Sequence, residues 1–215
     1  MLKIGHRGAK GHVAENTLAS FRKAIDLGVD MIELDIQLSL DKIPMVIHDP
    51  TIDRTTNKTG LVSDYTAKEL HHLGIPTLAA VFELAQNNCE INIEIKAFEA
   101  TQAVLDLIAK NSFSKDKLLL SSFDWNALQE IRFHDDAIRI GVLTETNLDL
   151  ALAFAKFIKA YSIHPYYHLL KQENIRYLKE KSFKIFPWTI NEPEDITFVK
   201  SLEVDGIITD FPERI

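Results

Sequence analysis

Three acidic residues in two short apolar segments have the spacing to bind a divalent cation. Glu33 and Asp35 alternate in IELDIQL, and Glu94 stands in INIEIK. Side chains two positions apart on a strand point to the same face. Each charge would be costly to bury without a partner. Three convergent carboxylates therefore predict a hard cation such as Mg²⁺, Ca²⁺ or Mn²⁺. The structural alternative is a Glu94 to Lys96 ion pair exposed to solvent at the end of its strand.

Two histidines add acid-base chemistry to these acids. His6 and His48 each end a strand-like run. Because a histidine titrates near neutral pH, one can accept a proton while the other donates one. Arg7 and Lys96 are positive donors for a phosphate, Arg7 as a fork and Lys96 as a point charge. Together these residues favour metal-assisted phosphoryl transfer, with cleavage of a phosphodiester. The remaining histidines are expected to be structural or on the surface: His12, His71, His72, His134, His164 and His168.

The elements that must position these residues alternate along the chain. Short apolar, strand-like runs cover 2–5, 31–37, 91–95, 118–121, 138–142, 160–163, 183–188 and 206–208. Segments with helical periodicity cover 16–27, 77–86, 100–110, 125–133, 147–156, 171–180 and 195–200. Strand followed by helix, about eight times, predicts an α/β fold of the (β/α)8 barrel type. A doubly wound open sheet is the alternative.

One segment interrupts this alternation. The run at 44–48 follows the strand at 31–37 too closely for a helical crossover, so a hairpin is expected. A turn near Asp41 and Lys42 would bring His48 back beside Asp35. Residues 49–76 are then a polar, turn-rich excursion of the length typical of functional loops or small inserted elements. We therefore expect one domain over residues 1–215, with an insertion at about 38–76 after the second strand.

Composition limits the partners and the setting. The chain has 215 residues, with 24 basic and 31 acidic side chains and a net charge of -7. This balance disfavours nucleic acid or an anionic membrane held by a general positive field. Cys89 is the single cysteine, and the first residues do not resemble a signal peptide. No apolar run approaches the ~20 residues of a membrane helix. A cytoplasmic protein without a membrane span is expected.

The motifs resemble those of the glycerophosphodiester phosphodiesterase family, and they occur in order over nearly the whole chain. They are HRG (6–8), ENT (15–17), ELD (33–35), HD (48–49), DRTT (53–56), PTL (76–78), EIK (94–96), SSF (121–123), WT (188–189) and GIITDFP (206–212). Each motif is short, but HRG, ELD, HD and EIK together are specific.

This resemblance implies a TIM-barrel enzyme with a divalent cofactor. It implies hydrolysis of glycerophosphodiesters, such as glycerophosphocholine or glycerophosphoethanolamine, to glycerol 3-phosphate and an alcohol, which would link the protein to lipid and glycerol metabolism. The attacking group could be water or the 2-hydroxyl of the glycerol. The implied roles are metal binding by Glu33, Asp35 and Glu94, acid-base catalysis by His6 and His48, and phosphate contact by Arg7 and Lys96.

Four further residues have other expected positions or roles. Trp188 could line the substrate cleft and stack on a choline cation. Phe123 could also line this cleft, and both aromatic side chains could instead lie in the core, which is the favoured position for Phe123. Asn16 is expected to cap the helix that it begins. Asp210 could contact substrate or help to close the barrel.

Two other functions remain open. A lysophospholipase D-type enzyme of the same fold would need an apolar cleft or a membrane-facing loop, whereas the insertion here is polar. A phosphodiester-binding barrel without turnover would not need the full set of catalytic residues, all of which are present.

Overall fold

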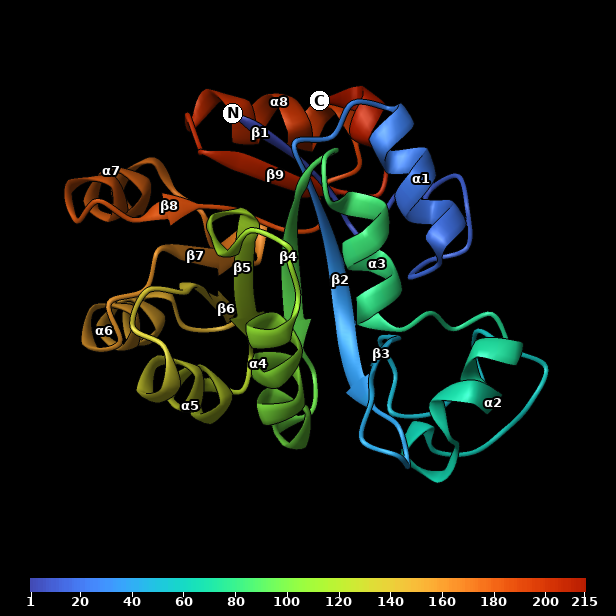
Figure 1. Ribbon diagram of the computed structural model, residues 1–215. Coiled ribbons are helices and arrows are strands. Elements are labelled where there is room, and N and C mark those ends of the chain that lie inside the picture. The colour runs from blue at the N-terminus through green and yellow to red at the C-terminus, as the bar shows by residue number, and fades with distance from the viewer.

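The computed structural model describes all 215 residues and shows a parallel barrel with helices outside it (Figure 1). Eight parallel strands are hydrogen bonded in the order β8-β7-β6-β5-β4-β2-β1-β9. They are β1 (Leu2–Gly5), β2 (Met31–Leu38), β4 (Glu90–Ile95), β5 (Leu118–Ser122), β6 (Arg139–Thr144), β7 (Ser162–Pro165), β8 (Lys184–Ile185) and β9 (Gly206–Thr209). Between β8 and β9, Asp205 N donates to Ile185 O at 3.1 Å and Ile208 N to Pro187 O at 3.0 Å. The predicted (β/α)8 barrel is therefore confirmed, and the open sheet is excluded.

Seven helices cover the outside of the barrel. They are α1 (Leu18–Asp26), α3 (Leu78–Ala85), α4 (Thr101–Lys110), α5 (Trp125–His134), α6 (Leu148–Phe157), α7 (Gln172–Glu180) and α8 (Pro193–Ser201). Five short 3-10 segments lie among the loops: η1 (Val62–Asp64), η2 (Phe98–Ala100), η3 (Lys115–Lys117), η4 (Tyr167–Leu169) and η5 (Pro212–Arg214). None of the helices has the length and apolar composition needed to cross a membrane.

The N-cap of helix α1 lies one residue later than predicted. Thr17, and not Asn16, is the N-cap, because the Thr17 hydroxyl accepts from Ser20 N at 3.1 Å. The Asn16 backbone is left-handed, with φ 55°, a conformation that asparagine tolerates better than most residues. Its side chain is thereby free to reach the barrel.

The predicted strand at 183–188 is mostly irregular. Only β8 pairs regularly, and Trp188 forms an isolated bridge to Tyr166. Pro187 lacks a backbone N–H and cannot donate to a ladder, which explains the early end of the strand.

Apolar side chains close the barrel beneath its mouth. The floor is formed by Ile4, Met31, Leu119, Phe186 and Ile208, each at most 2 % exposed. Burying side chains of this size is worth about 1.5–3 kcal/mol each. The floor is continuous with the acidic layer, because residues 31, 33 and 35 share one face of β2. A larger apolar cluster lies between the strands and the helices.

The segment after β2 forms a small unit beside the barrel, and this unit includes α2 (Ala67–His72) (Figure 1). The predicted hairpin is confirmed: β3 (Pro44–Val46) pairs antiparallel with β2, with Ile36 opposite Val46. Ile47 N donates to Asp35 O at 3.0 Å, which brings His48 to the acidic layer. The unit has its own apolar cluster, formed by Met45, Ile47, Ile52, Val62, Leu70 and Ile75.

Candidate active site

Strands β2 and β4 bring three carboxylates together at the barrel mouth. Asp35 and Glu94 are direct partners in the parallel register, and Glu33 lies one step down the same face of β2. One oxygen of each lies within 4.8 Å of the others. Glu33 and Asp35 are only 3 % and 1 % exposed. The structure thus groups the acids as predicted.

Two cations offset this charge incompletely. Lys96 Nζ lies 2.7 Å from Glu94 Oε1, so the alternative ion pair is present. Arg7 lies on the other two acids: its backbone N donates to Glu33 Oε2 at 2.8 Å, and its Nε lies 3.1 Å from Asp35 Oδ2.

The remaining negative charge helps to raise the pKa values of two of these acids. Burial, with Asp35 and Glu94 nearby, raises the pKa of Glu33 well above its usual value. Burial, followed by Asp35, raises the pKa of Glu94 to about 7. An oxygen-rich donor set whose anions lack sufficient positive charge fits a hard divalent cation.

The HRG turn positions Arg7 over the acids. Arg7 and Gly8 both have left-handed backbones, with φ 51° and 87°. A Cβ on Gly8 would lie 2.4 Å from Ser20 Oγ, so only glycine fits this turn. Ser20 Oγ also donates to Arg7 O at 2.9 Å, which fixes the turn to α1. Although burial disfavours its charge, Asp35 and the neighbouring acids raise the pKa of Arg7.

His6 is held by a carboxylate that directly follows the last strand, β9. Its Nδ1 lies 2.6 Å from Asp210 Oδ1, and Asn191 Nδ2 donates to Asp210 Oδ2 at 2.8 Å. Burial lowers the pKa of His6, although the hydrogen bond to Asp210 opposes this. The neutral ring with its proton on Nδ1 is therefore favoured, which leaves Nε2 as a proton acceptor.

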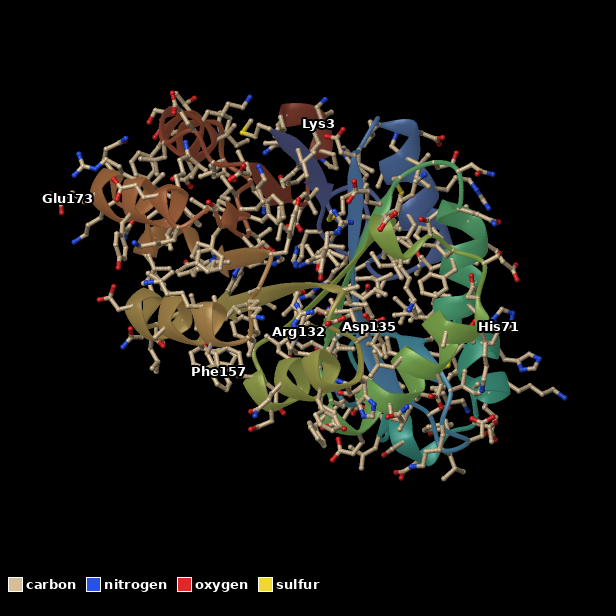
Figure 2. The ribbon with its side chains drawn as sticks, turned by 60° about the vertical axis from the view of Figure 1, so that its left-hand side comes forward. Lys3, His71, Arg132, Asp135, Phe157 and Glu173 are labelled. Carbon is tan, nitrogen blue, oxygen red and sulfur yellow. The ribbon has the colours of Figure 1, made fainter.

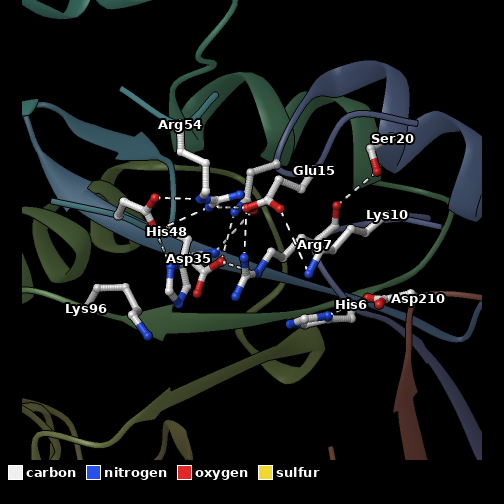
Figure 3. A network of polar contacts seen from close by, with 12 residues as sticks. His6, Arg7, Lys10, Glu15, Ser20, Asp35, His48, Arg54, Lys96 and Asp210 are labelled. Atoms are coloured by element: carbon white, nitrogen blue, oxygen red, sulfur yellow. Dashed lines mark hydrogen bonds and ion pairs between the residues drawn. The ribbon is translucent and has the colours of Figure 1, made fainter. Parts of the chain in front are cut away.

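His48 has a different carboxylate partner. His48 Nδ1 lies 2.6 Å from Asp49 Oδ1, and Arg54 Nε donates to Asp49 Oδ2 at 2.7 Å. The Arg54 hydrogen bond lowers the pKa of Asp49 to about 2. Arg54 Nη2 also donates to Glu15 Oε1 at 2.7 Å, and this oxygen accepts from Arg7 Nη1 at 2.7 Å (Figure 3). A continuous polar network therefore joins the loop that follows His6 to the segment that carries His48.

The site residues surround a central cavity of about 110 Å³. Phe123 and Trp188 form part of its wall, with an edge-to-face contact at 5.4 Å between ring centroids. Of the two positions predicted for Phe123, the core is wrong and the cleft wall is confirmed: Phe123 is 39 % exposed and lines the cavity. Trp188 Nε1 donates to His164 O at 2.8 Å. The cavity is lined by His6, Arg7, Glu33, His48, Asn92, Glu94, Lys96, Phe123, Leu143, Trp188, Thr189 and Ile208.

Sequence reasoning missed the partners of several members of the polar network. Asn16 Nδ2 donates to Asp35 Oδ2 at 2.8 Å. Glu15, Asp49 and Arg54 complete the network, and Asp210 binds His6. Their motifs, ENT, HD, DRTT and GIITDFP, were visible, but the partners of these residues were not.

The other histidines lie outside the central cavity. His71 is exposed on the outer side of α2 (Figure 2), and His12 lies 3.0 Å from Glu213. His164 is fully buried, which lowers its pKa to about 3, and its Nε2 forms a hydrogen bond with Ser162 Oγ at 2.8 Å.

The comparisons with known proteins identify the same fold and family. The model of the "Glycerophosphoryl diester phosphodiesterase family" matches residues 6–214. The chain belongs to this family, as the motifs indicated.

Related proteins agree over the full length. A glycerophosphodiester phosphodiesterase from Caldanaerobacter subterraneus subsp. tengcongensis is 37 % identical over 232 residues, covering 100 % of this chain and 96 % of the relative. The crystal structure of a glycerophosphodiester phosphodiesterase from Thermotoga maritima is 35 % identical with a TM-score of 0.88, covering 99 % and 96 %. An Oleispira antarctica phosphodiesterase, solved with its product sn-glycerol-3-phosphate, is 26 % identical with a TM-score of 0.91, covering 99 % and 94 %.

Proposed function

We propose that this protein hydrolyses glycerophosphodiesters, such as glycerophosphocholine and glycerophosphoethanolamine, to glycerol 3-phosphate and an alcohol. The observation that carries the proposal is the central cavity, which is lined by two oriented histidines, two cations and two members of the group of three carboxylates. The family membership supports it, as does the product bound to the Oleispira antarctica relative. All proposed site residues lie at the barrel mouth.

We assign metal binding to Glu33, Asp35 and Glu94, with Mg²⁺, Ca²⁺ or Mn²⁺ as the cation. When bound, such a cation would supply positive charge against the negative charge that develops on the phosphate. Arg7 and Lys96 would hold and orient the phosphate oxygens.

His6 and His48 have complementary roles in this proposal. His6, favoured as the neutral ring, accepts the proton of the attacking hydroxyl at Nε2, while Asp210 holds its Nδ1–H. His48, held by Asp49, donates a proton to the oxygen of the departing alcohol. Phe123 and Trp188 exclude water from one side of the cavity and pack against the substrate.

We also propose that residues 1–215 form one domain, with the insertion at about 38–76, and that the protein works in a reducing cytoplasm. The family match over residues 6–214 supports the former, and the single, buried thiol of Cys89 is compatible with the latter.

The test is release of glycerol 3-phosphate from glycerophosphocholine and glycerophosphoethanolamine, with EDTA and then with Mg²⁺, Ca²⁺ or Mn²⁺ restored. We expect release that stops with EDTA and returns with at least one cation. Cleavage of lysophospholipid alone would establish the lipid-directed alternative. Binding of either substrate without turnover at any cation would establish a non-catalytic barrel.

A further inference from the structure

A second cavity, which we call the rim cavity, adjoins the central one. It has a volume of about 700 Å³ and lies between the loop after β1 and the insertion. His48 lines both cavities, whereas His6 lines only the central one. The central cavity, at about 110 Å³, is too small to enclose both halves of a glycerophosphodiester together with a bound cation. A group attached to the phosphate on the His48 side would therefore extend into the rim cavity.

The rim cavity has positive groups with unused hydrogen-bond donors. Its charged lining residues are Lys10, Glu15 and Arg54, with two histidines beside them. Glu15 is already engaged: Oε1 accepts from both Arg7 and Arg54 at 2.7 Å. Although burial opposes it, these contacts hold the pKa of Glu15 at about 2.

Lys10 is the least engaged of these cations. Its Nζ lies 3.9 Å from Glu15 Oε2, beyond hydrogen-bond distance, and it donates no hydrogen bond within the protein. Arg54 uses Nε and Nη2 for Asp49 and Glu15, which leaves Nη1 without a partner. A ligand rich in acceptor oxygens would satisfy these donors.

The same lining is poorly suited to a quaternary ammonium. No phenylalanine, tyrosine or tryptophan is present, so an aromatic cage is absent. The one carboxylate is already paired. Apolar groups complete the walls and suit a carbon skeleton; they are Val13, Ala14, Val46, Ile47, Leu73 and Ile75.

We propose that the rim cavity is the binding site of the departing alcohol and selects a polyol or anionic alcohol over choline, with Lys10 as the specificity-determining residue. This inference rests on the proposed function, since it assigns the other half of the same substrate. Lys10 and Arg54 donate to hydroxyl or carboxylate oxygens of the head group, and the alcohol leaves past His48. Figure 3 shows Lys10 and Arg54 on either side of Glu15.

The experiment is competition between glycerophosphoinositol and glycerophosphocholine in one reaction, which gives the ratio of their kcat/KM values. Because both substrates share the catalytic residues, a general change in catalysis cancels in this ratio. We expect wild type to favour glycerophosphoinositol. Lys10→Ala should lower the ratio about 10-fold, as expected for loss of one charge-assisted hydrogen bond, and Lys10→Glu should reverse the preference.

Two controls separate the possible failures. Glycerophosphomethanol has no head group that could reach the rim cavity, so Lys10 should not contact this substrate. Its KM should therefore change less than about 2-fold in Lys10→Ala. Lys110→Glu, on the exposed end of α4, changes the net charge equally and should leave the ratio unchanged. If both Lys10 variants still turn over substrate and their ratio of kcat/KM values is unchanged from wild type, the inference is overturned. Absence of turnover with all three diesters overturns the proposed function instead.

Discussion

His6 and His48 are the same residue type in different surroundings. The partner of His6 is Asp210, which accepts a hydrogen bond from the neutral amide of Asn191. The partner of His48 is Asp49, which accepts a hydrogen bond from the charged guanidinium of Arg54. The side chain of His6 is 13 % exposed and that of His48 is 31 % exposed. His48 also faces the rim cavity, where the alcohol would depart. These differences are why we propose His6 as the base and His48 as the acid.

A leaving-group comparison tests this division. In His48→Ala, hydrolysis of glycerophosphocholine should fall by ~100-fold or more, the usual scale for loss of a general acid. The same variant should lose much less activity toward glycerophospho-p-nitrophenol, because nitrophenolate leaves without protonation. His6→Ala should be impaired equally with both substrates. Equal losses in both variants with both substrates would contradict the assignment.

The attacking group can be determined with the same substrates. If the 2-hydroxyl of the glycerol attacks, a cyclic glycerol phosphate should be detectable by phosphorus NMR when hydrolysis of that intermediate is slowed. His48→Ala with the nitrophenyl substrate provides this condition, because the first step then needs no acid while the second step lacks His48. A substrate that lacks this hydroxyl should then be inert. Direct appearance of glycerol 3-phosphate alone, with turnover of the deoxy substrate, would identify water as the nucleophile.

At the scale of elements, the insertion is joined to the barrel through Arg54. This side chain pairs with Asp49 on its own segment and with Glu15 on the loop after β1. Arg54→Ala should lower the free energy of unfolding by about 1–2 kcal/mol at pH 7, the sum expected for two partly exposed pairs.

The effect should depend on pH in a defined direction. Arg54 bonds lower the pKa of Asp49 to about 2; for Glu15, burial opposes the shift, but Arg54 and Arg7 still bring its pKa to about 2. Folded-state values below the unfolded ones stabilise the fold above about pH 4.5, and this stabilisation is lost as pH falls toward 2. Urea unfolding from pH 7 to pH 3 should therefore show the variant approaching wild type. Arg22→Ala, exposed on α1, is the matched control, and a difference independent of pH would refute the argument.

The sequence predicted those features of the fold and site that depend on local strand geometry, but not the pairs formed between distant elements. Alternation within IELDIQL and INIEIK predicted that the acids share a face, because that depends only on local strand geometry. The pairs His6 with Asp210 and Arg54 with Glu15 join residues 204 and 39 positions apart, so no local pattern encodes them. Asn16 was assigned wrongly for a related reason: the neighbouring Thr17 satisfies the cap, and the left-handed backbone turns Asn16 toward Asp35.

At the scale of the whole molecule, the apolar floor and the charged mouth have opposite effects on stability. The floor is closely packed beneath the acids, whereas Glu33 is buried beside Asp35 and Glu94 without enough positive charge. We expect a site of this kind to lower the stability of the metal-free protein and a bound cation to restore it.

Glu33→Gln separates these two contributions. The amide keeps the acceptor for Arg7 N but removes one buried charge. The metal-free variant should therefore be more stable by about 1–2 kcal/mol, which is a Tm higher by about 2–8 °C for a chain of this size. The rise in Tm that Mg²⁺ or Ca²⁺ gives wild type should be much smaller in the variant. Glu83→Gln, exposed on α3, should match wild type in both measurements. A Glu33→Gln protein that is less stable in EDTA and still gains the full Tm increase would show that the three carboxylates are not the cation site.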